Sequence, residues 1–333
     1  MCRRRWATPE LPGPASAGHV ALVGVTASGK SRLAAQLARA RPDAELVSVD
    51  SMAVYRGMDI GTAKPPPDER AALHYHLIDL VEPDEEFTLR QFQASAREAL
   101  AGIEARRHRA LLVGGTALYL RAVVDDLELP GRWPELADQL EREAEGPGGV
   151  PALHARLTAL DPAAASRMTA SNRRRVVRAL EVTLGSGRPF SSFGSGLAVH
   201  HPSPVRLVGI PFDPQATDRA VEARFQDLLD AGLLDEVRHL AARPAGLSRT
   251  ARQALGYREL LAHVEDGVAL DSAIAEAVRR TRGFARRQWA WFRRDPRIHW
   301  LDPNRDLLPQ LLEHWDEAAD ERGAPAAAVG DLG

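Results

Sequence analysis

Only two of the 43 basic residues of this 333-residue chain are lysines, and each is a candidate for a role in ligand binding or catalysis. Where arginine is used so heavily, a retained lysine indicates a place that needs a compact ammonium, because the broad guanidinium fork cannot act as a point charge between phosphate oxygens. Lys30 lies in a run that matches the phosphate-loop pattern G-x-x-x-x-G-K-[ST]: Gly24, Val25, Thr26, Ala27, Ser28, Gly29, Lys30 and Ser31. Backbone N–H groups of such a loop attract phosphate oxygens, and the Ser31 hydroxyl can bind Mg²⁺. The sequence therefore predicts a site for a phosphorylated ligand.

Asp50 is the second candidate, because it directly follows the apolar run of residues 45–49. A carboxylate in that place can hold Mg²⁺, cap a helix or accept a proton as a general base. For an isolated aspartate the first two interpretations would be preferred. The stretch that follows, residues 51–65, contains Lys64 in a loop with glycines, and the sequence shows no folding requirement for this lysine. Its presence favours a catalytic role for Asp50.

Short apolar runs and the helices between them should position these residues. Residues 19–26 (HVALVGVT) predict a buried strand that feeds the phosphate loop, and residues 109–115 (RALLVGG) predict a strand that leads to Thr116. Strands that alternate with helices indicate an α/β fold with a doubly wound parallel sheet flanked by helices. Ligands gather at the carboxyl ends of such strands, so the phosphate loop, Asp50 and Thr116 are expected along one edge.

Composition divides the chain into five segments: a flexible leader (1–17), the first part of the core (18–124), a helical insertion (125–204), the second part of the core (205–315) and a disordered tail (316–333). The insertion has no strand-like run. Further elements are expected as helices at 31–40, 151–160, 173–184, within 215–261 and at about 271–294, and as strands at 45–49, 205–211 and 298–301.

Composition also bears on location and partners. With 44% hydrophobic residues and no run of about 20 apolar residues, the chain is expected to be globular and without a membrane span. The one cysteine, Cys2, cannot form an internal disulfide, and no signal peptide is recognisable, so the reducing cytoplasm is the expected location. A monomer is expected as well. The formal net charge of −2 does not by itself indicate a polyanionic partner, but the arginines are clustered.

Eight segments together resemble the tRNA dimethylallyltransferase (tRNA isopentenyltransferase) family: GVTASGKS, SVDSMAVYRGMDIGTAKP, HLID, LLVGGTALYL, DPAAASRM, RRVVRALEV, ARQALGYRE and TRGFARRQWAWFRR. The resemblance implies a P-loop NTPase-like core with an inserted, mainly helical domain. It also implies transfer of a dimethylallyl group from dimethylallyl diphosphate to the exocyclic amine of the adenosine 3′-adjacent to the anticodon, in tRNAs that read codons beginning with U. The phosphate loop would then hold the diphosphate of the donor rather than ATP.

The resemblance assigns a role to each part of this chemistry. An allylic carbon that leaves its diphosphate develops positive character, so the charge gathering on the diphosphate must be stabilised by Lys30, by Mg²⁺ on Ser31 and by an arginine, for which Arg252 is the match. Asp50 matches the base that orients the weakly nucleophilic adenine amine and takes its proton. Thr26 matches the loop threonine that touches the leaving group.

The predicted tRNA contacts follow from the resemblance and from the arginine clusters, for which a solvated face is the alternative. The target base must swing out of the anticodon loop, and the stem-loop backbone must be held. Arg280, Arg287 and Arg294 recur every seven residues, which predicts one basic side of a long helix, whereas Trp289 and Trp291 are expected in the core. The predicted tRNA-binding set is Asp50, Ser51, Met52, Ala53, Thr116, Arg174, Arg175, Val176, Val177, Arg178, Arg280 and Arg287.

Some features leave alternatives open. Ala53 stands where the family usually has glutamine, and Ala137 lies near a commonly basic position, so local substrate contacts are open at both. A small-molecule kinase could use ATP at the same loop, with the insertion as its lid. An RNA-binding nucleotide switch without catalysis would use the arginine clusters equally well.

Overall fold

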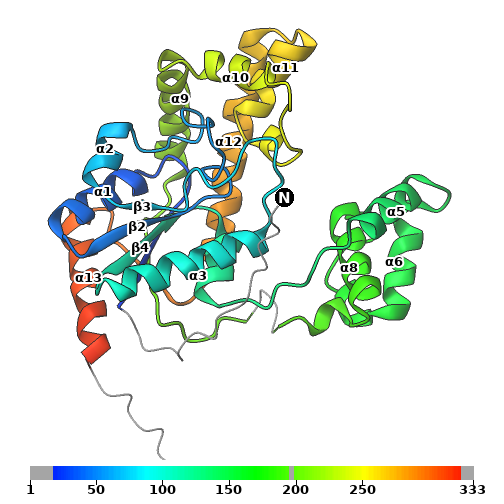
Figure 1. Cartoon of the computed structure of the whole chain (residues 1–333), viewed down its shortest axis with the longest axis horizontal. Helices are drawn as coiled ribbons and strands as arrows, with labels where there is room; N and C mark the ends of the chain where they lie inside the picture. Colours follow the sequence, from blue (N-terminus) through cyan, green and yellow to red (C-terminus); the bar gives the residue numbers. More distant parts are fainter. Residues whose placement is uncertain (1–17, 195–198, 324–333) are drawn as a thin grey trace, which may run out of the picture. The chain divides into compact units, whose positions relative to one another are not determined.

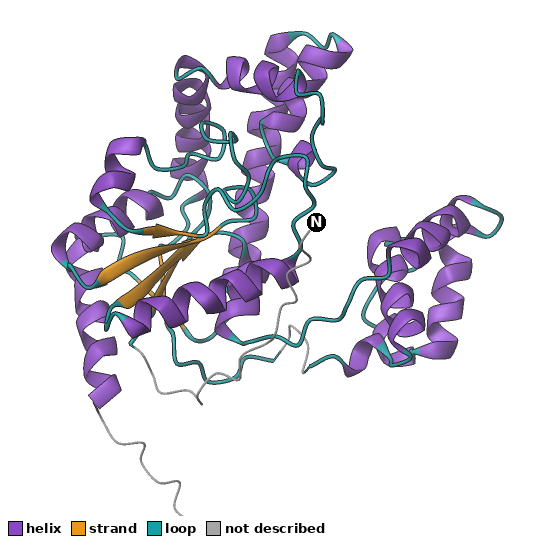
Figure 2. Cartoon of the chain, in the orientation of Figure 1, coloured by secondary structure: helices purple, strands orange, loops and turns teal. Residues whose placement is uncertain are grey.

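The structure is a computed structural model, and it describes residues 18–194 and 199–323, with side chains to residue 320. The chain forms two compact units. Figure 2, which colours the chain by secondary structure, shows helices and strands in one unit and helices in the other. The core unit combines the chain up to Val124 with the chain from Pro202 onward, and the helical unit runs from Asp125 to His201. The helical unit therefore ends at residue 201 rather than at 204. The predicted leader at 1–17 lies outside the described residues.

A six-stranded parallel sheet in the order β3-β2-β4-β1-β5-β6 forms the centre of the core unit (Figure 1). Its strands are β1 (Val20–Val23), β2 (Ala44–Val49), β3 (Tyr75–His76), β4 (Arg109–Gly114), β5 (Arg206–Gly209) and β6 (Ile298–Trp300). The predicted α/β class is confirmed, and β3 is an edge strand that the sequence analysis omitted. All-parallel strands are buried on both faces, which is why they are continuous apolar runs in the sequence.

Alternating side chains of the strands feed two separate apolar clusters, one on each face of the sheet. Val20 and Leu22 point to the face covered by α1 (Lys30–Ala40) and α13 (Leu307–Gly323). Ala21 and Val23 point to the other face, where α3 (Leu89–Ala105) and α4 (Ala117–Val124) pack. Figure 1 shows α1 and α13 on one side of the sheet and α3 on the other. The short helix α2 (Pro67–Ala72) precedes β3.

Four further helices extend the second apolar cluster beyond the sheet (Figure 1). They are α9 (Pro214–Asp230), α10 (Leu233–Ala241), α11 (Tyr257–Asp266) and α12 (Leu270–Phe292), with a 3₁₀ turn at Ala251–Gln253. The buried residues of α12 recur at helical spacing and form one stripe: Ala273, Ala277, Ala285, Gln288 and Phe292. The polar member of this stripe, Gln288, lies within an otherwise apolar face.

The helical unit has its own small core. It contains α5 (Pro134–Glu145), α6 (Gly149–Leu160), α7 (Pro162–Ala165), α8 (Arg173–Ser186) and a 3₁₀ turn at Phe190–Ser192. Leu140, Leu157 and Leu180 are fully buried between these helices. The sequence analysis predicted α6 and α8 and missed α5, whose apolar positions are sparse and scattered among charged residues.

The predicted disordered tail is wrong for residues 316–323, which complete α13. Trp315 is fully buried, and Arg109 lies against its ring at 4.0 Å and donates to its carbonyl at 2.7 Å. Asp316 forms an ion pair with Arg41 at 2.6 Å, so the helix is docked on both sides of the predicted boundary. Residues 324–333 lie outside the described part of the chain. Within that part, no helix is long and apolar enough to cross a membrane.

Candidate active site

The carboxyl ends of three adjacent strands bring the predicted chemical residues to one edge of the sheet. The register places Val23 of β1 beside Gly114 of β4, and Val49 of β2 on the other side of the same glycine. A side chain at Gly114 would lie 2.1 Å from the Val49 carbonyl oxygen, so glycine allows these loops to pack tightly. The phosphate loop follows β1, Asp50 follows β2 and Thr116 follows β4, as predicted.

Lys30 is the first residue of α1, and Asp50 is the carboxylate whose negative charge acts on it. Its Nζ donates to the Val25 carbonyl of its own loop at 3.2 Å. Burial and the positive charge of Arg224 lower the pKa of Lys30 to about 8, and the negative charge of Asp50 opposes this shift. Two cations close enough to repel each other, in partly buried surroundings, form a site for an anion that is more highly charged than one carboxylate.

Arg224 is a candidate site residue that the sequence analysis missed. It lies on α9, where burial lowers its pKa and the charge of Asp50 raises it. One arginine on a polar helix, in a chain with 43 basic residues, carries no motif of its own. Only the packing of α9 beside the sheet edge identifies it, because no spacing rule connects residue 224 to residue 30.

Asp50 is held at the mouth of β2 by its own backbone. Its Oδ1 accepts a hydrogen bond from the Met52 N–H at 2.7 Å, which fixes the carboxylate in a local turn. Burial raises the pKa of the neighbouring Tyr119 hydroxyl to about 12, with smaller contributions from the charges of Tyr55 and Asp50. The charge of Asp50 therefore acts on two cations, Lys30 and Arg224, and on the Tyr119 hydroxyl. This arrangement suits a carboxylate that accepts a proton.

The next residues of the predicted set differ in exposure. Ser51 and Met52 are partly buried, and Met52 packs against the apolar cluster. The Ala53 side chain is buried, and its carbonyl accepts from the Asp79 N–H at 3.1 Å. A tRNA contact at Ala53 stays a prediction, and the buried methyl group gives it no support.

Lys64 has a structural role that the sequence did not reveal. Its side chain is 1% exposed, and its Nζ donates to the Tyr55 carbonyl, to Asp59 at 2.7 Å and to Asp79 at 2.6 Å. Glu236 holds the same loop from α10, because it accepts the backbone N–H groups of Asp59 and Ile60 at 2.9 and 2.8 Å. A compact ammonium is needed here for folding, so Lys64 gives no support to the catalytic interpretation of Asp50.

Arg252 lies in the 3₁₀ turn before α11, and its guanidinium forms a two-pronged ion pair with Glu265. The arginine whose charge acts on Lys30 and is itself influenced by Asp50 is Arg224. The structure therefore brings Arg224 to the phosphate loop, and a diphosphate contact by Arg252 stays a prediction.

Within the helical unit, the predicted tRNA-binding residues fall into three groups. Arg174 and Arg175 are exposed in the first turn of α8. Val176 and Val177 are buried in the core of this unit, which gives no support to a tRNA contact through their side chains, so a contact at these two positions stays a prediction. Arg178 donates to the carbonyls of Pro130 and Gly131 and pairs with Glu181 at 2.8 Å, which anchors the segment before α5.

The arginines of α12 are also unequal. Arg280 forms an ion pair at 3.2 Å with buried Glu259, which in turn accepts the Gly256 N–H at the start of α11. Arg287 is exposed, 5.9 Å from the Phe284 ring. Arg294 lies beyond the end of the helix at Phe292, so the seven-residue repeat does not continue on one helical side. Trp291 is 37% exposed, which corrects its predicted core position.

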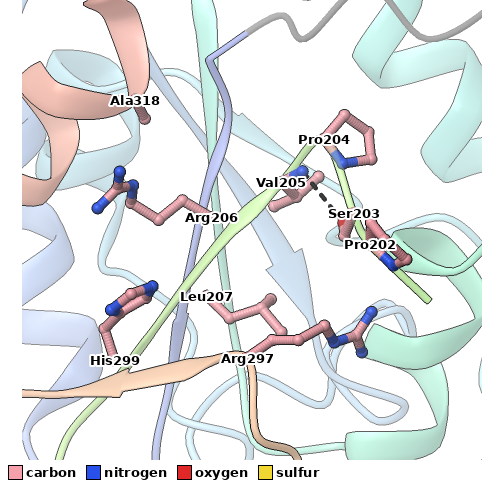
Figure 3. Close-up of a pocket in the computed structure, with 9 residues that line it drawn as sticks. All are labelled: Pro202, Ser203, Pro204, Val205, Arg206, Leu207, Arg297, His299 and Ala318. Carbon is pink, nitrogen blue, oxygen red and sulfur yellow. Dashed lines mark hydrogen bonds between the residues drawn. The ribbon is translucent and has the colours of Figure 1, made fainter. Parts of the chain in front are cut away.

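A pocket at the opposite edge of the sheet contains none of the predicted residues (Figure 3). It has a volume of about 480 Å³ and is lined by residues before and within β5 and β6, among them Arg206, Arg297 and His299. Arg206 pairs with Glu317, and Arg297 with Asp295. The pocket lies at the amino ends of the strands, away from the loops that carry the candidate chemistry.

The core unit is a parallel sheet with a phosphate loop after β1. Lys30 of this loop and Arg224 of α9 carry more positive charge than the one carboxylate, Asp50, that acts on both. These features define a P-loop protein of the group-transfer class. The model of the IPP transferase family matches residues 53–295. The chain belongs to this family.

Named relatives agree with this assignment. The chain is 46% identical over 300 residues to a tRNA dimethylallyltransferase of Streptomyces coelicolor, covering 88% of this chain and 93% of the relative. It is 42% identical to that of Bifidobacterium animalis subsp. lactis, covering 89% and 84%. Among solved structures, the tRNA isopentenylpyrophosphate transferase of Bacillus halodurans is similar with a TM-score of 0.65 and 33% identity, covering 91% of this chain and 96% of the other. A eukaryotic dimethylallyltransferase described as acting on tRNA has a TM-score of 0.71 at 25% identity, covering 92% and 77%.

Proposed function

We propose that this protein transfers a dimethylallyl group from dimethylallyl diphosphate to the exocyclic amine of an adenosine in tRNA, the one 3′-adjacent to the anticodon in tRNAs that read codons beginning with U, giving isopentenyladenosine. The observation that carries the proposal is the juxtaposition of Lys30 and Arg224 with Asp50. Family membership supplies the reaction class, and the charges indicate which residue does what.

The leaving group would be held by the phosphate loop. Lys30 and Arg224 repel each other in the free site, and a diphosphate relieves that repulsion while its negative charge grows in the transition state. Thr26 would touch the leaving group from the loop, and Arg252 would contribute if its pairing with Glu265 opens. Binding a diphosphate in the cradle leaves the allylic carbon outside it, toward Asp50.

A Mg²⁺ ion is part of the proposal. The Ser31 hydroxyl is exposed in the first turn of α1, beside Lys30, which suits an ion that takes one protein oxygen and completes its shell with diphosphate oxygens and water. Among the described residues, no group of three or more His, Cys, Asp or Glu side chains is placed to hold a metal. When bound, the ion would neutralise charge on the departing diphosphate.

Asp50 would act on the acceptor. As the bond between the adenine nitrogen and the allylic carbon forms, the carbon–oxygen bond to the diphosphate breaks and the nitrogen must lose a proton. The Met52 N–H fixes one carboxylate oxygen, so the other is oriented to receive that proton. Ser51 and Thr116 would contact the adenosine from the neighbouring loops.

The rest of the tRNA would be held by exposed arginines. Arg174 and Arg175 of the helical unit and Arg287 of the core unit are the candidates that remain after the buried and paired residues are set aside. We propose that the protein works as a monomer in the cytoplasm, on the anticodon stem-loop.

The test is transfer of labelled dimethylallyl from its diphosphate to purified tRNA with Mg²⁺ and without ATP, followed by nucleoside analysis. We expect isopentenyladenosine at the position 3′ of the anticodon. Phosphorylation of a small metabolite from ATP, without prenyl transfer, would overturn the proposal in favour of a kinase. Tight RNA binding without any turnover would favour a non-catalytic switch.

A further inference from the structure

Gln288 is a buried amide that joins the phosphate loop to the loop after β4. It lies on α12 and is 5% exposed. Its Oε1 accepts the Thr26 N–H at 2.8 Å, and its Nε2 donates to the Gly115 carbonyl at 2.9 Å. One planar side chain therefore satisfies a donor in the first loop and an acceptor in the second, and an amide does so at any pH without carrying a charge.

The second loop is shaped to fit this amide. A side chain at Gly115 would lie 2.2 Å from the Gln288 Nε2 and 3.2 Å from the Gly24 carbonyl oxygen. Neither neighbour can withdraw, because the amide is hydrogen bonded on both sides and Gly24 belongs to the backbone of the phosphate loop. The requirement for glycine at position 115 is therefore a consequence of the bridge.

The two bridged loops carry different substrates in the proposed reaction. Thr26 belongs to the loop for the donor diphosphate, and Thr116, directly after Gly115, to the loop for the acceptor adenosine. We infer that Gln288 is a positioning residue that fixes the separation of the donor loop and the acceptor loop. The identity of the two substrates rests on the proposed function, whereas the bridge rests on the structure alone.

Positioning of this kind affects rate through geometry. Loops held before the ligands arrive need no rearrangement when the reaction begins, and small displacements of reacting groups lower rates steeply. Because the Thr26 N–H is directed to Gln288, the donor loop is held by the protein itself and not only by its ligand. Loss of the bridge should lower both diphosphate affinity and the rate of transfer.

Gln310 provides a matched control. It is also a buried glutamine, on α13, and its Oε1 accepts the Asp302 N–H at 2.8 Å while its Nε2 donates to the carbonyls of Asp302 and Asp306 at 3.1 and 3.0 Å. It bridges a loop to α13, the helix whose apolar side chains, among them Leu311, pack in the cluster on the α1 face. A substitution there tests the general effect of disturbing a buried amide bridge.

The sharpest test compares Gln288→Glu with Gln310→Glu over a range of pH. A protonated carboxyl reproduces the amide, since its O–H donates to Gly115 and its carbonyl accepts from Thr26, whereas the ionised form sets a negative oxygen against the Gly115 carbonyl. For Gln288→Glu we expect the single-turnover rate relative to the parent protein to rise about 10-fold as pH falls from roughly 8 to 6, with tRNA affinity unchanged. The affinity for inorganic pyrophosphate, measured by calorimetry, should rise in parallel. Gln310→Glu should show neither change.

A second variant covers the case in which the carboxyl prevents folding. Gln288→Met keeps the volume and removes both hydrogen bonds, and we expect pyrophosphate to bind roughly 10-fold more weakly than to the parent. Parent-like pyrophosphate affinity and turnover in Gln288→Met, or pH profiles in Gln288→Glu that match those of Gln310→Glu, would overturn the inference. If pyrophosphate affinity responds as expected while the parent protein transfers no prenyl group, the bridge stands and the proposed function fails.

Discussion

The two lysines of this chain occupy opposite kinds of environment. Lys64 is surrounded by a carbonyl and two carboxylates, so its charge is fully used in holding its loop. Lys30 has one carbonyl contact, a repelling arginine and one nearby carboxylate. Lysine can therefore be retained either to stabilise a loop or to bind a ligand. The charge that lacks partners in the folded protein, and not the residue type, identifies the place where a ligand binds.

Replacement of Lys30 should produce the largest effect on activity. In Lys30→Met we expect kcat/KM for the donor to fall by about 10²–10³-fold, because the compact positive charge at the diphosphate is lost. The free energy of unfolding should stay the same or increase, since a buried and repelled charge is removed. Steady-state kinetics and urea denaturation measure the two quantities. Loss of stability without loss of donor use would reverse the roles assigned to the two lysines.

Replacement of Lys64 should act on stability. Burial alone would raise the pKa of Asp79, because it favours the neutral carboxyl group. Hydrogen bonds from Lys64 and Arg70 outweigh burial and hold the pKa of Asp79 below its ordinary value. Lys64→Met leaves Asp59 and Asp79 without this partner, and we expect the free energy of unfolding to drop by about 3 kcal/mol. At a temperature where the variant remains folded, the affinity for pyrophosphate should be close to that of the parent. A parent-like denaturation curve would contradict this.

The pH dependence of donor use should follow Lys30. Its lowered pKa of about 8 means that the free site holds the ammonium below that pH and loses it above. We expect kcat/KM for the donor to decline about 10-fold per pH unit above roughly pH 8, whereas kcat at saturating donor stays level because the bound diphosphate favours the charged form. A flat kcat/KM profile up to pH 10 would show that Lys30 is not in this environment.

Two arginines of α12 differ in the same way, and replacing them should have smaller effects. Arg280 is paired with a buried carboxylate, whereas Arg287 is exposed. Arg287→Gln should weaken tRNA binding and lower its salt dependence by about one unit of slope, with the melting temperature unchanged. Arg280→Gln removes the partner of buried Glu259 and should mainly lower the melting temperature. Filter binding at several salt concentrations and thermal denaturation separate the two. Equal salt slopes in both variants and the parent would exclude Arg287 from the RNA surface.

Local patterns predicted much of this structure because they act locally. The apolar runs that became β1, β2, β4 and β5 are continuous, and parallel strands bury both faces, so the sheet edge with the phosphate loop, Asp50 and Thr116 could be located in advance. The helix α13 could not, because its ordering depends on Trp315 and Asp316 meeting residues more than 200 positions away. Arg224 and Gln288 were hidden for the same reason, because their contacts join distant segments and no periodicity encodes them. The partners of Lys64 lie within 15 positions of it, but they are loop contacts for which the sequence carries no periodic pattern.

The central claim is that Asp50 takes the proton from the acceptor amine beside an occupied diphosphate cradle. Asp50→Asn tests it most directly, because the amide oxygen can still accept the Met52 N–H while the basic oxygen is lost. In a single-turnover assay at saturating donor and tRNA, we predict a rate at least about 10²-fold below that of the parent, with pyrophosphate and tRNA affinities retained. A rate within roughly threefold of the parent would contradict the account, because proton removal would then not depend on this carboxylate.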